Sequence, residues 1–109
     1  MNDIKRTILT AAYKENEATR TATEKMTDEY IEFIKNGGRN TGEADAEDEL
    51  LGHIKYGAQM DESFHKMVIY ANVNDNLNFY SEYAEFLKQK NNAQLCAEDF
   101  KQAIHPNND

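Results

Sequence analysis

Cysteine, proline and long apolar runs are scarce in this sequence of 109 residues. The single cysteine, Cys96, has no partner within the chain, which excludes a disulfide-stapled secreted scaffold. No apolar run approaches the ~20 residues of a membrane span, and the N-terminus lacks the apolar core of a signal peptide. The only proline, Pro106, follows the last helical pattern, and no long stretch alternates as a strand would. We therefore expect an all-α, cytoplasmic protein.

Basic residues are also few, because 12 Lys and Arg stand against 20 Asp and Glu, a formal net charge of −8. This balance argues against direct binding of nucleic acid and against docking on anionic membranes, since both need a basic face. The excess charge is concentrated in one part of the chain. Residues 1–40 carry seven acids and seven bases, whereas residues 41–62 carry seven acids and one base. We therefore expect any electrostatic function near residues 43–49.

A long helix is predicted over residues 1–35 from the spacing of apolar and small residues. The residues on this face are Ile4, Ile8, Ala11, Ala22, Met26, Tyr30 and Phe33. Asn2 or Asp3 can cap its start, and Asn36-Gly37-Gly38 is a strong helix stop. The middle of the helix is polar. That predicts a break near Thr21, a stretch projecting beyond the core, or pairing with another chain.

A second helix is predicted after the Gly-rich loop 36–42, with Thr41 or Asp45 as its N-cap. Its apolar face is formed by Leu50/Leu51, Ile54, Ala58, Phe64, Met67/Val68 and Ala71. The segment 72–76, rich in Asn and Asp, predicts a turn.

A third helix over residues 77–90 presents an apolar face, and Asn91-Asn92 predicts its end and the start of a fourth helix. The face of the third helix consists of Leu77, Tyr80, Ala84 and Leu87, with Tyr83 and Phe86 beside it. The fourth helix stops at His105-Pro106. The predicted fold is a small all-α bundle of about four helices with a long N-terminal helix. It forms a single helical domain over residues 1–105, and residues 106–109 are expected to be a frayed tail.

Two Glu–His pairs, Glu49 with His53 and Glu62 with His65, lie one helical turn apart. The second pair has the Glu-x-x-His spacing that di-iron helical bundles use. A complete di-iron site needs a second such motif, and Gln102 stands where His105 would need a glutamate. A metal-binding four-helix module is therefore an alternative hypothesis, while the main prediction includes no metal and no cofactor.

Catalytic motifs are missing from the sequence. Cys96 lies beside Leu95 and Phe100 on an apolar face, which favours a core residue over a nucleophile. There is no Gly-x-Ser-x-Gly motif, no phosphate-binding Gly-rich loop and no EF-hand spacing. We therefore expect no enzymatic activity.

The acidic stretch at the start of the second predicted helix is the strongest functional candidate. It places five carboxylates in seven residues: Glu43, Asp45, Glu47, Asp48 and Glu49. Carboxylates at a helix N-terminus are favoured by the helix dipole, so a solvated helix start is one interpretation. The other is a contact surface for a basic protein, because clustered charge accelerates association. Tyr56, nearby on the same helix, is a candidate anchor for such a partner.

The function that these observations favour is a non-catalytic regulator or inhibitor that binds a protein with a basic surface. In size, acidity and lack of catalytic motifs the chain resembles the small proteins by which phages and mobile elements block host machinery. That resemblance implies an acidic surface that takes the place of nucleic acid on a basic or nucleic-acid-binding protein. A further alternative is a helical oligomer with a small molecule between its helices. The thin apolar face of residues 1–35 predicts a homodimer or higher oligomer with that helix in the interface.

Overall fold

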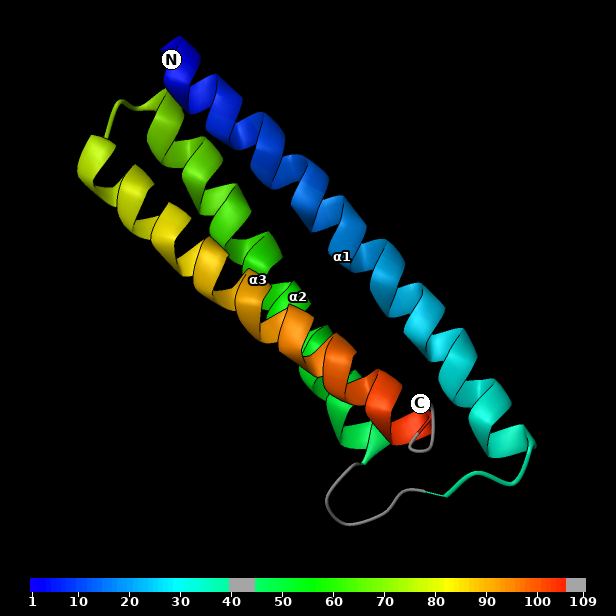
Figure 1. Ribbon diagram of the computed structural model, residues 1–109. Helices are drawn as coiled ribbons and strands as arrows, with labels where there is room; N and C mark the ends of the chain where they lie inside the picture. The colour runs from blue at the N-terminus through cyan, green and yellow to red at the C-terminus, as the bar shows by residue number, and fades with distance from the viewer. Residues whose placement is uncertain (40–44, 106–109) are drawn as a thin grey trace.

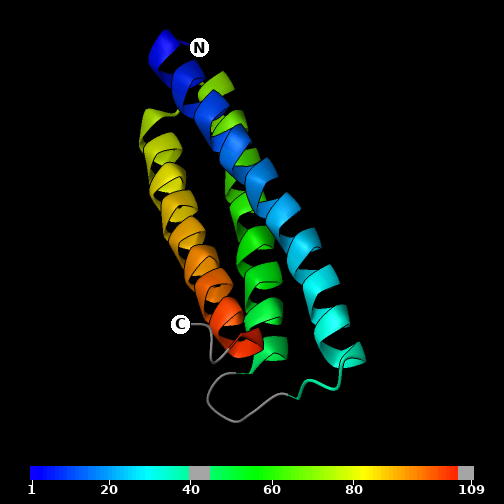
Figure 2. The same ribbon diagram turned by 45° about the vertical axis from the view of Figure 1, so that its right-hand side comes forward.

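The computed structural model describes residues 1–39 and 45–105, and over these residues the chain forms three helices and no strand (Figure 1). Helix α1 spans Asp3–Lys35, α2 spans Ala46–Asn72 and α3 spans Asn76–Ile104. The helices lie side by side in up-down-up order, in a bundle measuring 53 × 23 × 21 Å (Figures 1 and 2). The predicted all-α class is confirmed. The tail at 106–109 lies outside the described residues.

The ends of the helices follow local capping chemistry, as the sequence predicts. The side chain of Asn2 accepts a hydrogen bond from the backbone N–H of Lys5, and Asp45 does the same for Glu47 and Asp48. After α1, Gly37 adopts a φ of +84°, which a residue without a side chain tolerates. The turn between α2 and α3 is also confirmed, with Asp75 as the N-cap of α3. Over the described residues, no helix combines the length and hydropathy that crossing a membrane requires.

The predicted break at Asn91-Asn92 is wrong, because α3 runs through both residues without interruption. The chain therefore has three described helices rather than about four. The Asn92 side-chain amide donates to the side-chain oxygen of Gln89 at 3.2 Å, and the neighbouring Ala93 is buried. Asn costs a helix at most ~0.7 kcal/mol relative to Ala. Burial of the residues around the pair outweighs that cost.

The predicted break near Thr21 is also absent, since α1 is continuous from end to end. Its polar middle is satisfied in two ways. Five threonine hydroxyls donate to the carbonyl four residues earlier: Thr7, Thr10, Thr19, Thr23 and Thr27. In addition, Asn16 and Thr23 make side-chain contacts with α2. The middle of α1 therefore pairs with a polar surface of its own chain.

The core consists of two clusters along the bundle. The larger joins α2 and α3, and its fully buried side chains include Met60, Met67, Phe79 and Phe86, with Ala12 of α1 against them. The smaller lies where α1 and α3 end and α2 begins. It contains Met26, Ala46, Leu50, Phe100 and Ala103. Only part of each predicted apolar face belongs to these clusters.

The clearest departure from the predicted core is on α3. Over residues 77–90 its buried face carries Phe79 and Phe86, whereas Phe100 further along is buried as the sequence predicts. The face that the sequence favoured is exposed instead, with Leu77 at 83% and Tyr80 at 44% of their maximum accessibility. Aromatic residues remove more apolar area from water, which explains why their face takes the core position.

Candidate functional site

The predicted acidic surface lies at the N-terminus of α2, and the structure describes four of its five carboxylates. Glu47 and Asp48 are exposed in the first turn. Asp45 has a structural task, because its carboxylate accepts from the backbone N–H groups of Glu47 at 2.9 Å and Asp48 at 3.4 Å. Glu43 lies outside the described residues. The exposed charge of this stretch therefore sits directly beyond a capping interaction that fixes the helix start.

Glu49 connects this stretch with α3. Its carboxylate is half-buried and accepts a hydrogen bond from the thiol of Cys96. Partial burial raises the pKa of Glu49, and the nearby carboxylates of Asp99, Asp48 and Asp45 raise this pKa further. Asp99 belongs to α3, so negative charge from two helices acts on one carboxyl group. We call the set Asp45, Glu47, Asp48, Glu49 and Asp99 the acidic end.

Cys96 of α3 packs against Gly52 of α2. A Cβ added to Gly52 would lie 2.8 Å from the Cys96 sulfur, so the glycine makes room for the thiol. Burial and the Glu49 carboxylate both raise the pKa of Cys96. A raised pKa keeps the thiol protonated and a poor nucleophile.

Tyr56, the predicted anchor, is half-buried and packs against the larger core cluster. The ammonium group of Lys55 lies 5.4 Å from the centre of its ring. Tyr56 also follows Glu49 by seven residues, or about 10 Å along the helix axis at 1.5 Å per residue. The ring therefore contributes to the core more than to the acidic end.

The four residues that the metal hypothesis would use as ligands each contact a different side chain. His53 is buried, and its Nδ1 lies 2.7 Å from the hydroxyl of Thr23. Glu49 bonds the Cys96 thiol, Glu62 pairs with Lys66 at 3.2 Å, and His65 lies 3.4 Å from Asp61. Among the described residues, no group of three or more His, Cys, Asp or Glu side chains is placed to hold a metal ion.

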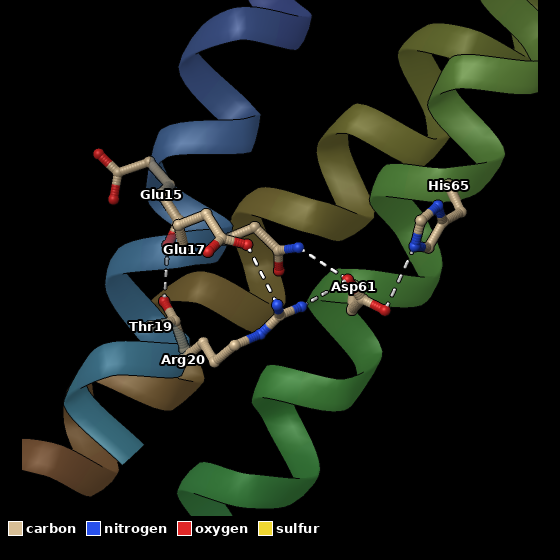
Figure 3. A network of polar contacts seen from close by, with 7 residues as sticks. Glu15, Glu17, Thr19, Arg20, Asp61 and His65 are labelled. Atoms are coloured by element: carbon tan, nitrogen blue, oxygen red, sulfur yellow. Dashed lines mark hydrogen bonds and ion pairs between the residues drawn. The ribbon is translucent and has the colours of Figure 1, made fainter. Parts of the chain in front are cut away.

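A polar seam between α1 and α2 is the feature that the sequence analysis missed (Figure 3). Asp61 lies at its centre and accepts a hydrogen bond from the side-chain amide of Asn16 at 2.8 Å. Arg20 approaches the same carboxylate at 3.7 Å and pairs with Glu17 at 3.3 Å. The signal that the sequence offered was the polar middle of α1, which includes Asn16 and Arg20.

A groove of about 280 Å³ opens along this seam. Its lining residues are Asn16, Thr19, Arg20, Thr23, Glu24, Ile54, Gly57, Ala58 and Asp61. Small-molecule sites are usually ~300–1,000 Å³ and present convergent polar groups to the ligand. Here the polar groups bond one another, and no buried side-chain nitrogen or oxygen within residues 1–39 and 45–105 lacks a partner. The polar groups that line the groove are therefore already bonded within the chain, and few remain for a ligand.

Comparison of the chain with protein-family models, with curated proteins and with solved structures found no match. Over the described residues the fold defines an elongated three-helix bundle with an acidic end and a polar seam.

Proposed function

We propose that the chain is a non-catalytic regulator that binds a basic surface of another protein through its acidic end. The observation that carries the proposal is the convergence of carboxylates from α2 and α3 at the start of α2, around Glu49. Partial burial is the main reason why the pKa of Glu49 is raised, and the carboxylates of Asp99, Asp48 and Asp45 raise this pKa further because they make the local potential negative. A cationic partner would offset the repulsion among these carboxylates, and this electrostatic gain would favour binding at the acidic end.

Two carboxylates of the acidic end, Asp45 and Glu49, are held in place before any partner arrives. Asp45 holds the first turn of α2 through two backbone hydrogen bonds, and the Cys96 thiol holds Glu49. Preformed charges lose little conformational entropy on binding, and they steer a partner of opposite charge toward the surface. Such steering raises association rates by ~10–1,000-fold and weakens as salt increases.

The partner chemistry that fits is a Lys- or Arg-rich surface of a protein that ordinarily binds nucleic acid. Carboxylates on a rigid helix end would take the positions of phosphates on that surface. The chain would then act as the small inhibitors of phages and mobile elements do, by occupying the nucleic-acid site of its target. The net charge of −8 suits this role, since it disfavours direct contact with nucleic acid.

The test compares two triple variants with equal change in net charge. The first neutralises the acidic end with Glu47→Gln, Asp48→Asn and Asp99→Asn. The matched control neutralises three acids elsewhere, with Glu17→Gln, Glu62→Gln and Glu82→Gln. Binding of a fluorescent polylysine peptide is measured by anisotropy at two salt concentrations. We expect at least tenfold weaker binding and a flatter salt dependence for the first variant, and a change within twofold for the control. Equal weakening by both would show that only overall charge matters, and it would refute the proposal.

A displacement assay tests the competition with nucleic acid. Labelled duplex DNA is first bound to polylysine, and the protein is then added. We expect release of the DNA by the native chain and by the control variant, and much weaker release by the variant of the acidic end. Failure of the native chain to release DNA at saturating concentration would remove the inhibitory mechanism.

A further inference from the structure

The second half of α1, residues 17–35, buries few side chains, and we call this segment the distal half of α1. It runs beside the start of α2 and the end of α3 (Figures 1 and 2). Met26 is the one buried residue among residues 17–35. Stretches of equal length at 46–64 of α2 and 86–104 of α3 bury five residues each. Two isoleucines of the distal half are each 45% exposed, Ile31 and Ile34.

Three grooves border the distal half of α1. The groove of about 280 Å³ along the polar seam separates it from α2. A second groove of about 180 Å³ lies between it and α3, with Met26 and Phe100 in its walls. A third of about 300 Å³ is lined by Phe33 of α1 and Ile104 of α3. Well-packed interiors contain few voids larger than a water molecule, so the distal half is incompletely packed against both neighbouring helices.

The contacts that hold the distal half to α2 include polar groups that water can replace. The Thr23 hydroxyl lies 2.7 Å from the buried Nδ1 of His53. Arg20 lies 3.7 Å from Asp61, and both side chains are partly exposed. When such groups separate, they bond water instead, so each contact contributes little to the net free energy of docking. The apolar contribution comes chiefly from Met26 and from the half-buried rings beside it.

The first half of α1 is attached differently. Ala12 is 2% exposed and belongs to the larger core cluster with Met60, Met67, Phe79 and Phe86. Two half-buried residues of α1 also pack against this cluster, Ile8 and Leu9. The first half therefore shares the apolar core of α2 and α3, which the distal half only borders.

We propose that the distal half of α1 is a lid, which undocks from α2 and α3 while the rest of the bundle stays folded. Segments with few buried apolar contacts open locally at a lower free energy than global unfolding requires. Undocking would remove Met26 from the smaller core cluster and would uncover Leu50 and Phe100. Leu50 directly follows Glu49, so the uncovered apolar surface would border the acidic end. The lid would thus control access to this apolar surface.

Hydrogen exchange of the native chain at pH 7, followed by mass spectrometry, tests the lid. Rates are expressed relative to those of an unstructured chain. We expect residues 20–27 to exchange at least tenfold faster than residues 8–15 of the same helix and residues 86–93 of α3. Residues 20–27 end eight residues before Lys35, so fraying of the last turn does not reach them. Uniform protection, or equally fast exchange along all of α1, would overturn the proposal.

A pair of matched variants tests whether incomplete packing causes the opening. Ala22 is half-buried and lines the groove between α1 and α3, so Ala22→Leu adds apolar volume there. We expect it to slow the exchange of residues 20–27 at least threefold. The control Ala18→Leu makes the same change at an exposed position of α1, and it should alter this exchange less than twofold. Equal exchange in the two variants would contradict the packing argument.

A second pair tests the polar contact with α2 and does not depend on whether Leu fits at position 22. Thr23→Val removes the hydroxyl beside His53, whereas the control Thr27→Val removes a hydroxyl that donates to the Thr23 carbonyl within α1. We expect at least fivefold faster exchange of residues 20–27 in Thr23→Val only. Equal acceleration in both would refute a role of the Thr23–His53 contact in holding the lid. No basic partner is present in these measurements, so their outcome is independent of the proposed function.

Discussion

Replacing His53 by glutamine tests the packing of α1 on α2 through the pH dependence of stability. His53 is 2% exposed, and its Nδ1 lies 2.7 Å from the Thr23 hydroxyl of α1. Burial lowers the pKa of His53 below its ordinary value of 6.5, because the imidazolium form loses its hydration. The folded chain therefore holds a neutral imidazole at pH values where the unfolded chain binds a proton.

The sign of the effect follows from this difference in bound protons. Well above pH 6.5 His53 is neutral in both states, and its titration takes nothing from the free energy of unfolding. As the pH falls below 6.5, the unfolded state takes up a proton first, so the free energy of unfolding decreases. One proton corresponds to a slope of at most ~1.4 kcal/mol per pH unit. The loss ends where the folded chain also becomes protonated, at its lowered pKa.

The assay is urea unfolding followed by circular dichroism, at constant protein concentration, between pH 7.5 and 5. His53→Gln removes the titrating group, and its amide retains the capacity to bond Thr23. We expect a smaller loss of stability on acidification in this variant than in the native chain. His65→Gln is the control, since His65 is an exposed histidine on the same helix. Parallel curves for the native chain and His53→Gln would refute the reasoning.

Further predictions concern packing. Gly57→Ala is expected to stabilise the chain by about 0.5–1 kcal/mol in urea unfolding, because the added Cβ meets only a threonine methyl group at 3.5 Å. Gly52→Ala should gain less, since its Cβ would lie 2.8 Å from the Cys96 sulfur; adding Cys96→Ala should recover the difference. Equal gains at the two glycines would contradict the close approach. Phe86→Ala is expected to cost about 3–5 kcal/mol, because the ring is 1% exposed. A cost below 1 kcal/mol in thermal unfolding would contradict its core position.

The helix ends were predictable because their chemistry is local. Asn2 and Asp45 each bond backbone N–H groups two or three residues away, and Gly37 supplies the positive φ after α1. Such features are visible within a few letters of sequence. The helix interior is different, since Asn91 and Asn92 resemble a break only until the packing around them is known.

The core face of α3 could not be selected from spacing. Phe79, Tyr83 and Phe86 repeat with the same helical period as Leu77, Tyr80 and Leu87. Both series satisfy the criterion for an apolar face, and only the contacts with α2 and α1 distinguish them. Similarly, the polar middle of α1 indicated an unusual environment for that helix. Its partner Asp61 could not be identified from the sequence, because it lies 45 residues after Asn16.

The acidic end was predictable in part. Glu47 and Asp48 are exposed in the first turn of α2, where the sequence placed the contact surface. The contribution of Asp99 was not visible, because it depends on how α3 aligns with α2. The half-buried position of Glu49 depends on the same alignment, and so does its bond with Cys96.

The most direct test of the account is the pKa of the Glu49 carboxyl group, measured by carbon NMR with and without the polylysine peptide. In the native chain we expect a pKa above the ordinary value of 4.5, and a lower value in Asp99→Asn. Saturation with the peptide should also lower it, because cations would then offset the surrounding carboxylates. A Glu49 pKa that does not respond to bound peptide would contradict the claim that the acidic end is the binding surface.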